Sequence, residues 1–133
     1  MKRLIPLVVG ALVSGCIDFV PAIDTSGVIT ATPKAFPYPG MYSGSSQSGI
    51  VTFKIRADGR GVSCFRNKFS GKLLLGDVKY DGAYLHTEDG VLIVESVTEN
   101  NIMTRVKHAT DFTIVFHRIR ETPSICRDFF NQQ

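Results

Sequence analysis

The amino-acid sequence predicts an all-β domain, an antiparallel meander of about eight short strands that closes into a small barrel. Apolar and polar residues alternate in several runs, as where Val51, Phe53 and Ile55 alternate with polar neighbours, which is typical of half-buried strands. Asp-Gly pairs, which favour tight hairpin turns, separate these runs at residues 58–59, 81–82 and 89–90. No segment keeps the 3.6-residue period of a helix over three turns. A two-sheet β-sandwich is the alternative architecture.

The expected strands follow one another at short intervals from Gly40 onward. They are placed near residues 41–42 and at 51–55, 62–66, 72–80, 83–87, 91–98, 102–107 and 112–119, with one short helical turn at 124–129. Connections this short make each strand the neighbour of the next. Closure into a barrel then removes the two exposed edges that a meander otherwise leaves. Residues 43–49, rich in serine and glycine, are expected to form a flexible loop.

Residues 1–15 have the pattern of a secretory signal peptide. Lys2 and Arg3 give a positive start, residues 4–12 are mostly apolar, and small residues lead to Cys16. A transmembrane helix needs about 20 apolar residues, roughly twice the length of this run. We therefore expect residues 1–15 to be removed, residues 16–39 to form a proline- and threonine-rich tether, and residues 40–133 to form the barrel-like domain.

Residues 13–16, Val-Ser-Gly-Cys, resemble the lipobox of bacterial lipoproteins. The resemblance implies cleavage before Cys16, diacylglycerol on its thiol, and an acyl chain such as palmitate on its new amino group. In that family the residue after the cysteine influences sorting in Gram-negative cells, and Asp there favours the inner membrane. Ile17 occupies that position here, so the resemblance implies the periplasmic face of the outer membrane. An ordinary signal peptide, cut elsewhere and leaving Cys16 as a thiol, is the alternative.

Cys64 and Cys126 remain once Cys16 is acylated, and an even pair of cysteines in an exported protein predicts a disulfide bond. The bond would close a loop of about 63 residues, for which loop-closure entropy gives about 4 kcal/mol of stabilisation. A redox-active or metal-binding thiol pair is the alternative. However, the sequence has no Cys-x-x-Cys motif and no histidines clustered beside these cysteines.

The stretch 54–72 is the most uneven in charge, with six basic residues against one acidic residue. Two phenylalanines are interleaved with the basic residues, which form a candidate patch for acidic glycans, lipid headgroups or an acidic partner: Lys54, Arg56, Arg60, Arg66, Lys68 and Lys72. The alternative is that these basic side chains only keep the outer strand faces solvated and protect strand edges from pairing with other chains. The formal charge of +3 falls to about +1 without Lys2 and Arg3, which argues against nucleic acid as a partner.

No catalytic or metal-binding constellation stands out in the sequence. His86, Glu88 and Asp89 are close together, but Asp89 belongs to an Asp-Gly turn, and one imidazole with a carboxylate does not complete a zinc shell. The other two histidines have no evident partner for general base catalysis. Residues 43–49 lack the ending of a phosphate loop and the strand–turn–helix setting of a nucleophilic serine. We therefore expect neither an enzyme nor a bound metal or cofactor.

Beyond the lipobox, the chain resembles the many small, uncharacterised β-rich lipoproteins of Gram-negative envelopes. Residues 79–84 and the position of Cys126 are also similar to lysozyme-inhibitor lipoproteins, which are small disulfide-bonded β-barrels. That family's inhibitory loop pairs Ser-Gly with a nearby Tyr, whereas Ser43-Gly44 is followed here by Ser, Ser and Gln. The expected function is a non-enzymatic, membrane-anchored module that binds an envelope protein or glycan. The alternatives are an inhibitor of a lysozyme-type enzyme and a calycin-like carrier of a small apolar ligand.

Overall fold

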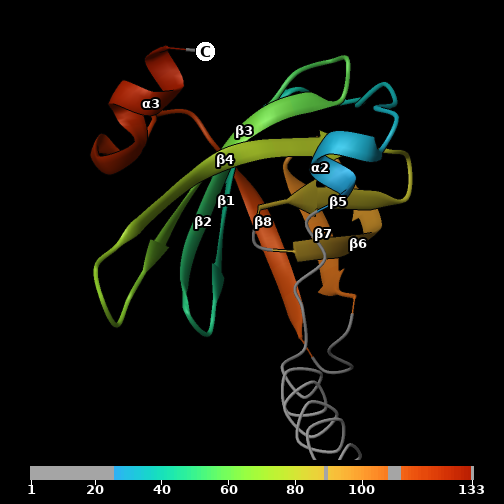
Figure 1. The fold of residues 1–133 in the computed structure, drawn as a ribbon. Coiled ribbons are helices and arrows are strands. Elements are labelled where there is room, and N and C mark those ends of the chain that lie inside the picture. The colour runs from blue at the N-terminus through green and yellow to red at the C-terminus, as the bar shows by residue number, and fades with distance from the viewer. Residues whose placement is uncertain (1–25, 89, 108–111, 133) are drawn as a thin grey trace, which may run out of the picture.

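The fold is an eight-stranded antiparallel barrel in which each strand pairs with its neighbours in sequence and β1 closes on β8 (Figure 1). The structure is a computed structural model, and it describes residues 26–88, 90–107 and 112–132. The strands are β1 (Gly40–Ser46), β2 (Gly49–Ile55), β3 (Arg60–Asn67), β4 (Leu73–Tyr80), β5 (Tyr84–Thr87), β6 (Gly90–Val97), β7 (Asn101–Val106) and β8 (Thr113–Ile119). Within the described residues, the short helical segments are α2 (Gly27–Thr30), the 3-10 turn η1 (Ser124–Cys126) and α3 (Arg127–Asn131). The expected meander and its closure are confirmed.

The turns of the barrel lie at two opposite ends. The β1–β2 turn marks one end, where Ser46 pairs with Gly49. The N–H of Lys68 donates to the carbonyl of Ser48 at 2.9 Å, which brings the β3–β4 turn to the same end. We call this the open end. The opposite, closed end carries the β2–β3 turn, where Gly59 has the φ of +87° that a tight Asp-Gly turn requires.

Aromatic side chains fill the interior toward the closed end. The rings of Tyr42 and Phe53 stack with centroids 5.6 Å apart, and Phe53 meets Phe116 edge to face at 4.9 Å. All three side chains are fully buried. Phe36, from the segment before β1, covers them with its ring centroid 6.2 Å from that of Tyr42. These buried rings fill the closed end of the barrel. Their edge-to-face and stacked contacts add to the favourable free energy of burying them.

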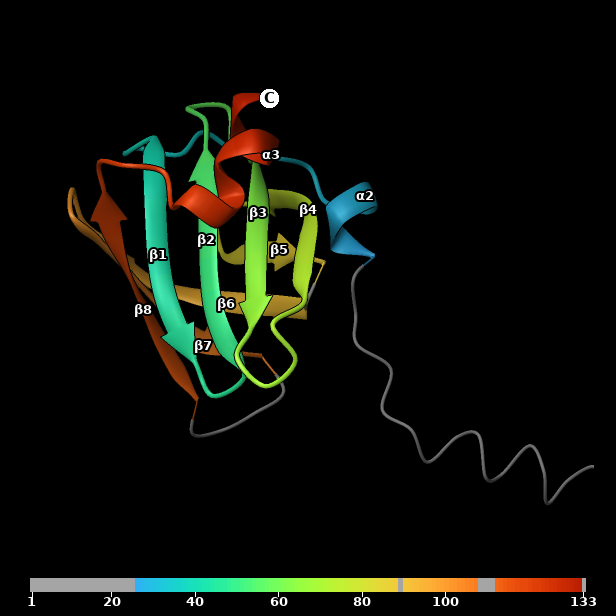
Figure 2. The ribbon, with the colours of Figure 1, turned by 90° about the vertical axis from the view of Figure 1, so that its left-hand side faces the viewer.

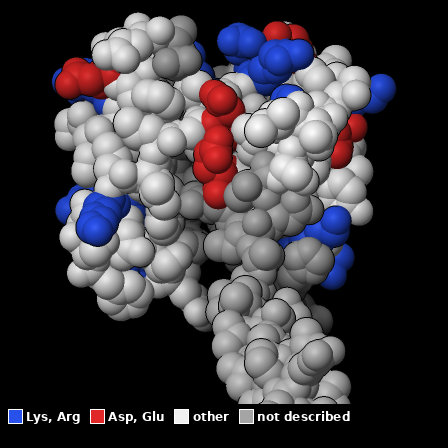
Figure 3. Space-filling view, in the orientation of Figure 1, with Lys and Arg blue, Asp and Glu red and all other residues white. Residues whose placement is uncertain are grey.

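The seam between β4 and β5 is short. Seven residue pairs join β3 to β4, whereas three join β4 to β5, from Val78↔Thr87 to Tyr80↔Leu85. The first half of β4 therefore pairs with β3 alone, and the side chain of Glu88 lies against Gly76 there. In the orientation of Figure 1, Figure 3 shows the surface hollowed between the two sides of the barrel, with acidic side chains beside the hollow.

A C-terminal tail covers the outer face of β2 and β3 (Figure 2). Cys126 in η1 forms a disulfide bond with Cys64 in β3, with their Cα atoms 6.0 Å apart, so the expected pairing is present. Phe130 of α3 is buried beside Val62 and the two cysteines in a second, smaller cluster. The tail therefore gives this outer sheet face an apolar cover, and its short helices match the helical turn expected at 124–129.

The chain before β1 packs on the barrel from residue 26, which corrects the expectation that all of residues 16–39 form a tether. Val28 of α2 is buried, and Phe36 is 3% exposed. The N–H of Lys34 donates to the carbonyl of Tyr80 at 2.8 Å, and the N–H of Phe36 donates to that of Ala57 at 2.9 Å. The apolar ring of Phe36 drives this docking, while neighbouring prolines keep the backbone extended. The proposed signal peptide and Cys16 lie outside the described residues.

Residues 43–46 belong to β1, so the expectation of a flexible loop over 43–49 is wrong for most of that segment. Gly44 faces the interior against Phe116, and Ser43 Oγ lies 3.2 Å from Thr52 Oγ1 on the opposite face. These residues have weak intrinsic strand preference. Pairing with β2 along the whole of β1 holds them in the sheet, because context outweighs propensity in strands.

Candidate functional site

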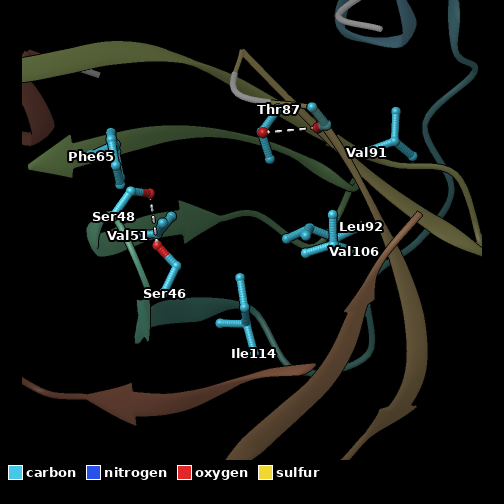
Figure 4. Close-up of a pocket in the computed structure, with 10 residues that line it drawn as sticks. Ser46, Ser48, Val51, Phe65, Thr87, Val91, Leu92, Val106 and Ile114 are labelled. Carbon is cyan, nitrogen blue, oxygen red and sulfur yellow. Dashed lines mark hydrogen bonds between the residues drawn. The ribbon is translucent and has the colours of Figure 1, made fainter. Parts of the chain in front are cut away.

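The open end of the barrel contains a cavity of about 300 Å³ (Figure 4). Its walls are mainly aliphatic and aromatic, and they come from every strand except β4: Ser46, Ser48, Val51, Phe65, Thr87, Gly90, Val91, Leu92, Val106 and Ile114. In Figure 4, Ser46, Val51 and Ile114 lie across a common space from Leu92 and Val106, whereas Val91 stands farther to the right. The cavity is therefore part of the barrel interior, and two of its lining residues, Leu92 and Ile114, belong to the same core cluster as the aromatic rings of the closed end.

The cavity exists because inward-facing side chains become smaller toward the open end. Along β1 the inward positions are Tyr42, Gly44 and then Ser46, and along β2 Phe53 gives way to Val51. Strand pairing fixes the distances between backbones, so the wall cannot move in to fill the space that small side chains leave. The hollow thus follows from residue types at alternate strand positions.

The polar groups of the lining are hydroxyls that already have hydrogen-bond partners. Thr87 Oγ1 donates to the carbonyl of Gly90 at 2.9 Å, and Ser46 Oγ lies 3.3 Å from Ser48 Oγ. None of the lining residues carries a titratable side chain. Such a site favours an uncharged, apolar group, because a charge buried there would lose its hydration without gaining a partner.

Arg118 of β8 holds the closed end together. Its guanidinium donates to the carbonyls of Glu99 at 2.7 Å and of Tyr38 and Pro39 at 3.2 Å, and to the Tyr42 hydroxyl at 2.9 Å. The Tyr42 hydroxyl in turn donates to the carbonyl of Tyr38 at 2.6 Å. Burial raises the pKa of Tyr42, and the positive charge of Arg118 offsets part of that rise. One side chain therefore joins β8, the β6–β7 turn and the segment before β1.

His86 is partly buried rather than lying on an open hairpin surface. Its Nε2 lies 2.7 Å from Asp81 Oδ2, and the two side chains are 13% and 23% exposed. Burial raises the pKa of Asp81, but hydrogen bonds from His86, Ala83 and Tyr84 outweigh that effect and hold the pKa below its usual value. The ring packs under Gly27 of α2, where an added Cβ would overlap it. The pair therefore fixes the β4–β5 turn and seats α2.

The six basic residues of the stretch 54–72 are all exposed, but they are spread along the barrel. Arg56 and Arg60 flank the β2–β3 turn at the closed end, whereas Lys68 and Lys72 lie at the β3–β4 turn at the open end. The eight-residue strand β3 separates these ends by about 25 Å. The structure thus divides the candidate patch into two groups, with the remaining two cations on the outer strand faces: Lys54 and Arg66.

The other residues considered from the sequence do not assemble into a site. Ser43-Gly44 lies inside β1 and forms no protruding inhibitory loop, and His117 is exposed with its Nδ1 2.8 Å from Asn101 Oδ1. His108 and Asp89 lie outside the described residues. Within residues 26–88, 90–107 and 112–132, no three His, Cys, Asp or Glu side chains are grouped as a metal ion would need. No helix in this described part has the length and apolarity to cross a bilayer.

Little in the sequence marks the cavity residues as a site. Strand alternation assigns Val51 and Ile114 to the core, and both do face the interior. The pattern does not reveal that the core is incomplete beside them. The available signal is the glycine- and serine-rich run 43–49, whose small inward-facing members leave the space, but in isolation that run looks like a loop.

Two solved structures share the barrel. A lipocalin lipoprotein affecting virulence in Streptococcus pneumoniae superposes with a TM-score of 0.53 and 16% sequence identity, covering 67% of this chain and 100% of that one. A candidate lipoprotein from Streptococcus pneumoniae gives a TM-score of 0.52 and 20% identity, covering 65% of this chain and 99% of that one. The barrel has a lipocalin-like fold. No protein-family model and no curated protein sequence matches the chain.

Proposed function

We propose that the protein is an exported, lipid-anchored and non-enzymatic binding module that holds a small apolar ligand in the open end of its barrel. The observation that carries this proposal is the apolar cavity of about 300 Å³ in a barrel whose other end is filled. The lipocalin-like fold supports it, because one solved structure of this fold is described as a lipocalin lipoprotein. The carrier is preferred over a glycan-binding module because sugar hydroxyls would find few free polar partners among the lining residues.

The cavity volume limits the size of the ligand. A dry, apolar cavity of about 150 Å³ in a protein core is enough to bind benzene or xenon. A space of about 300 Å³ therefore suits one ring system or a short acyl group. Burying about 200 Å² of apolar ligand surface gives about 5 kcal/mol before the cost of association. We therefore expect dissociation constants in the micromolar to millimolar range.

The test uses residues 16–133 carrying Cys16→Ser, which cannot be acylated but keeps every described contact. Binding is followed as displacement of a fluorescent naphthalene probe by alcohols of increasing chain length. Val51→Phe adds bulk inside the cavity and should weaken probe binding at least tenfold. Val115→Phe adds the same bulk on the outer face of β8 and should leave binding unchanged, with circular dichroism showing that both variants fold. No probe binding by the wild type, or equal binding by V51F, overturns the proposal.

The proposed attachment to the membrane is through Cys16, on the periplasmic face of the outer membrane. It rests on the lipobox resemblance of residues 13–16 and on Ile17 as the following residue. The mass of the protein purified from membranes should correspond to a chain that starts at acylated Cys16. Separation of the two membranes by density should place it with the outer membrane. An unmodified thiol at Cys16, or a different N-terminus, contradicts the anchor without affecting the cavity.

A further inference from the structure

The β3–β4 turn at the open end carries an aromatic side chain at its tip. Phe69 is 80% exposed, and the Lys68 ammonium group lies 5.1 Å from the centre of its ring. Asn67 orders the turn, because its Oδ1 accepts hydrogen bonds from the N–H groups of Phe69 and Ser70 at 2.9 and 3.1 Å. The N–H of Lys68 also donates to the carbonyl of Ser48. An ordered turn therefore presents the ring to solvent.

Other large apolar side chains are exposed at the same end. Ile50 at the start of β2 is 49% exposed, and Leu74 at the start of β4 is 53% exposed. Phe112 is 40% exposed. Its carbonyl accepts a hydrogen bond from the N–H of Val106 at the end of β7, which places it beside the β7–β8 connection. Several exposed apolar side chains at one end of a domain are typical of a contact surface for a protein or a membrane.

The charge around Phe69 in the β3–β4 turn is positive. Residues 66–76 include three basic side chains and no acidic one: Arg66, Lys68 and Lys72. The next acidic residue along the chain is Asp77, about 13 Å beyond the first residue of β4. Glu88 lies in the seam against Gly76. Figure 3 shows basic side chains at the lower left, on the side where Figure 1 places the β3–β4 turn.

We propose that the open end of the barrel docks on an anionic lipid bilayer, with Phe69 among the acyl chains and Lys68 and Lys72 at the headgroups. A ring at the tip with cations beside it matches the change of polarity across a bilayer interface. Each lysine held at an anionic surface strengthens binding about fivefold. A single protruding ring also fits lipid better than protein, because fluid acyl chains close around it and no complementary pocket is needed.

The lipid anchor is compatible with this orientation, although the docking does not depend on it. Residues 16–25 span at most about 35 Å when fully extended. The barrel is about 25 Å long along β3, so a chain anchored at Cys16 can reach α2 while the open end faces the bilayer. In this orientation the apolar cavity opens toward the lipid.

Tryptophan reporters test which part of the protein meets the lipid. The chain contains no tryptophan, so a single introduced indole reports its own surroundings. Phe69→Trp and Ile29→Trp place it at positions of matched exposure, 80% and 84%, on the open end and on α2. Both are made in residues 16–133 carrying Cys16→Ser, so that no acyl chain contributes. With phosphatidylglycerol vesicles, we expect the F69W emission to shift to shorter wavelength and to be quenched by lipids brominated on their acyl chains, and the I29W emission to stay unchanged.

Charge reversal tests the role of the lysines. Lys68→Glu with Lys72→Glu should weaken binding to phosphatidylglycerol vesicles at least about 25-fold, from about fivefold for each lysine. Lys54→Glu with Arg56→Glu makes the same change in net charge away from the open end and should weaken binding less than about threefold. Thermal unfolding shows that both pairs fold, and phosphatidylcholine vesicles should bind weakly. The docking proposal is overturned if the two reporters respond equally, if the two charge pairs have equal effects, or if the protein does not bind anionic vesicles. Binding of the naphthalene probe tests the cavity separately.

Discussion

Removing the Cys64–Cys126 disulfide should separate two effects of that bond on the fold. The double substitution Cys64→Ala/Cys126→Ala opens a loop whose ends are 62 residues apart in sequence. The loop-closure entropy that the unfolded chain regains corresponds to about 4 kcal/mol at 25 °C. Because small domains have total stabilities of about 5–15 kcal/mol, we expect a marginally stable but folded barrel.

The second effect concerns the C-terminal tail. Phe130 is 2% exposed and packs with Val62, and one buried phenylalanine contributes about 2–3 kcal/mol. Ordering the backbone of the tail costs about 1–2 kcal/mol for each residue, which this packing does not offset over residues 120–132. Without the disulfide, the tail should therefore detach while the eight strands keep their pairing.

Two measurements resolve these effects. Urea unfolding followed by circular dichroism gives the change in the free energy of unfolding, and hydrogen exchange shows whether the amides of α3 remain protected. The wild-type protein in reducing agent is the matched control and should behave like the double variant. A loss below about 1 kcal/mol, together with a tail that stays protected, would refute both the entropic argument and the dependence of the tail on the bond.

The remaining predictions concern the closed end and the contact under α2. Arg118→Lys should lower the free energy of unfolding by about 2 kcal/mol, because an ammonium group cannot reach the three carbonyls and the Tyr42 hydroxyl together; an unchanged urea midpoint contradicts this. Asp81→Asn should flatten the acid limb of the stability curve. The folded-state pKa of Asp81 is lowered, so its ionised form stabilises the fold above the unfolded pKa of about 3.9, and that contribution is lost as pH falls through the folded pKa. Thermal midpoints recorded across this acid range check it, and parallel curves for wild type and variant rule it out.

Local sequence patterns predict most of the strands and turns. Strands expected at 51–55, 72–80 and 102–107 form as Gly49–Ile55, Leu73–Tyr80 and Asn101–Val106. The Asp-Gly pairs are informative because Gly59 and Gly82 have φ values of +87° and +101°. A residue with a side chain would be strained in that backbone conformation. The alternation of apolar and polar residues also predicts the strands, because successive strand residues point to opposite faces wherever the strand lies.

Segments with weak local preference are the ones that sequence patterns misassign. The glycine- and serine-rich residues 43–46 look like a loop, yet β2 pairs with all of them. The segment before β1 looks like a free tether because its prolines interrupt any pattern, yet Phe36 is buried in the barrel core. In both segments the deciding contacts come from residues distant in sequence. The basic stretch 54–72 is also divided by the fold. Strand β3 runs along the barrel, so basic residues that are close in sequence lie at its opposite ends.

By itself, the sequence determined the order of the strands, the alternation of inward- and outward-facing side chains along most of them and the pairing of Cys64 with Cys126, because these depend on near neighbours and on residue type. Only the tertiary structure decided that the interior is filled at one end and hollow at the other, and that Phe69 and its lysines lie at the hollow end. Those features depend on the register of all eight pairings around a closed barrel, which no single segment specifies.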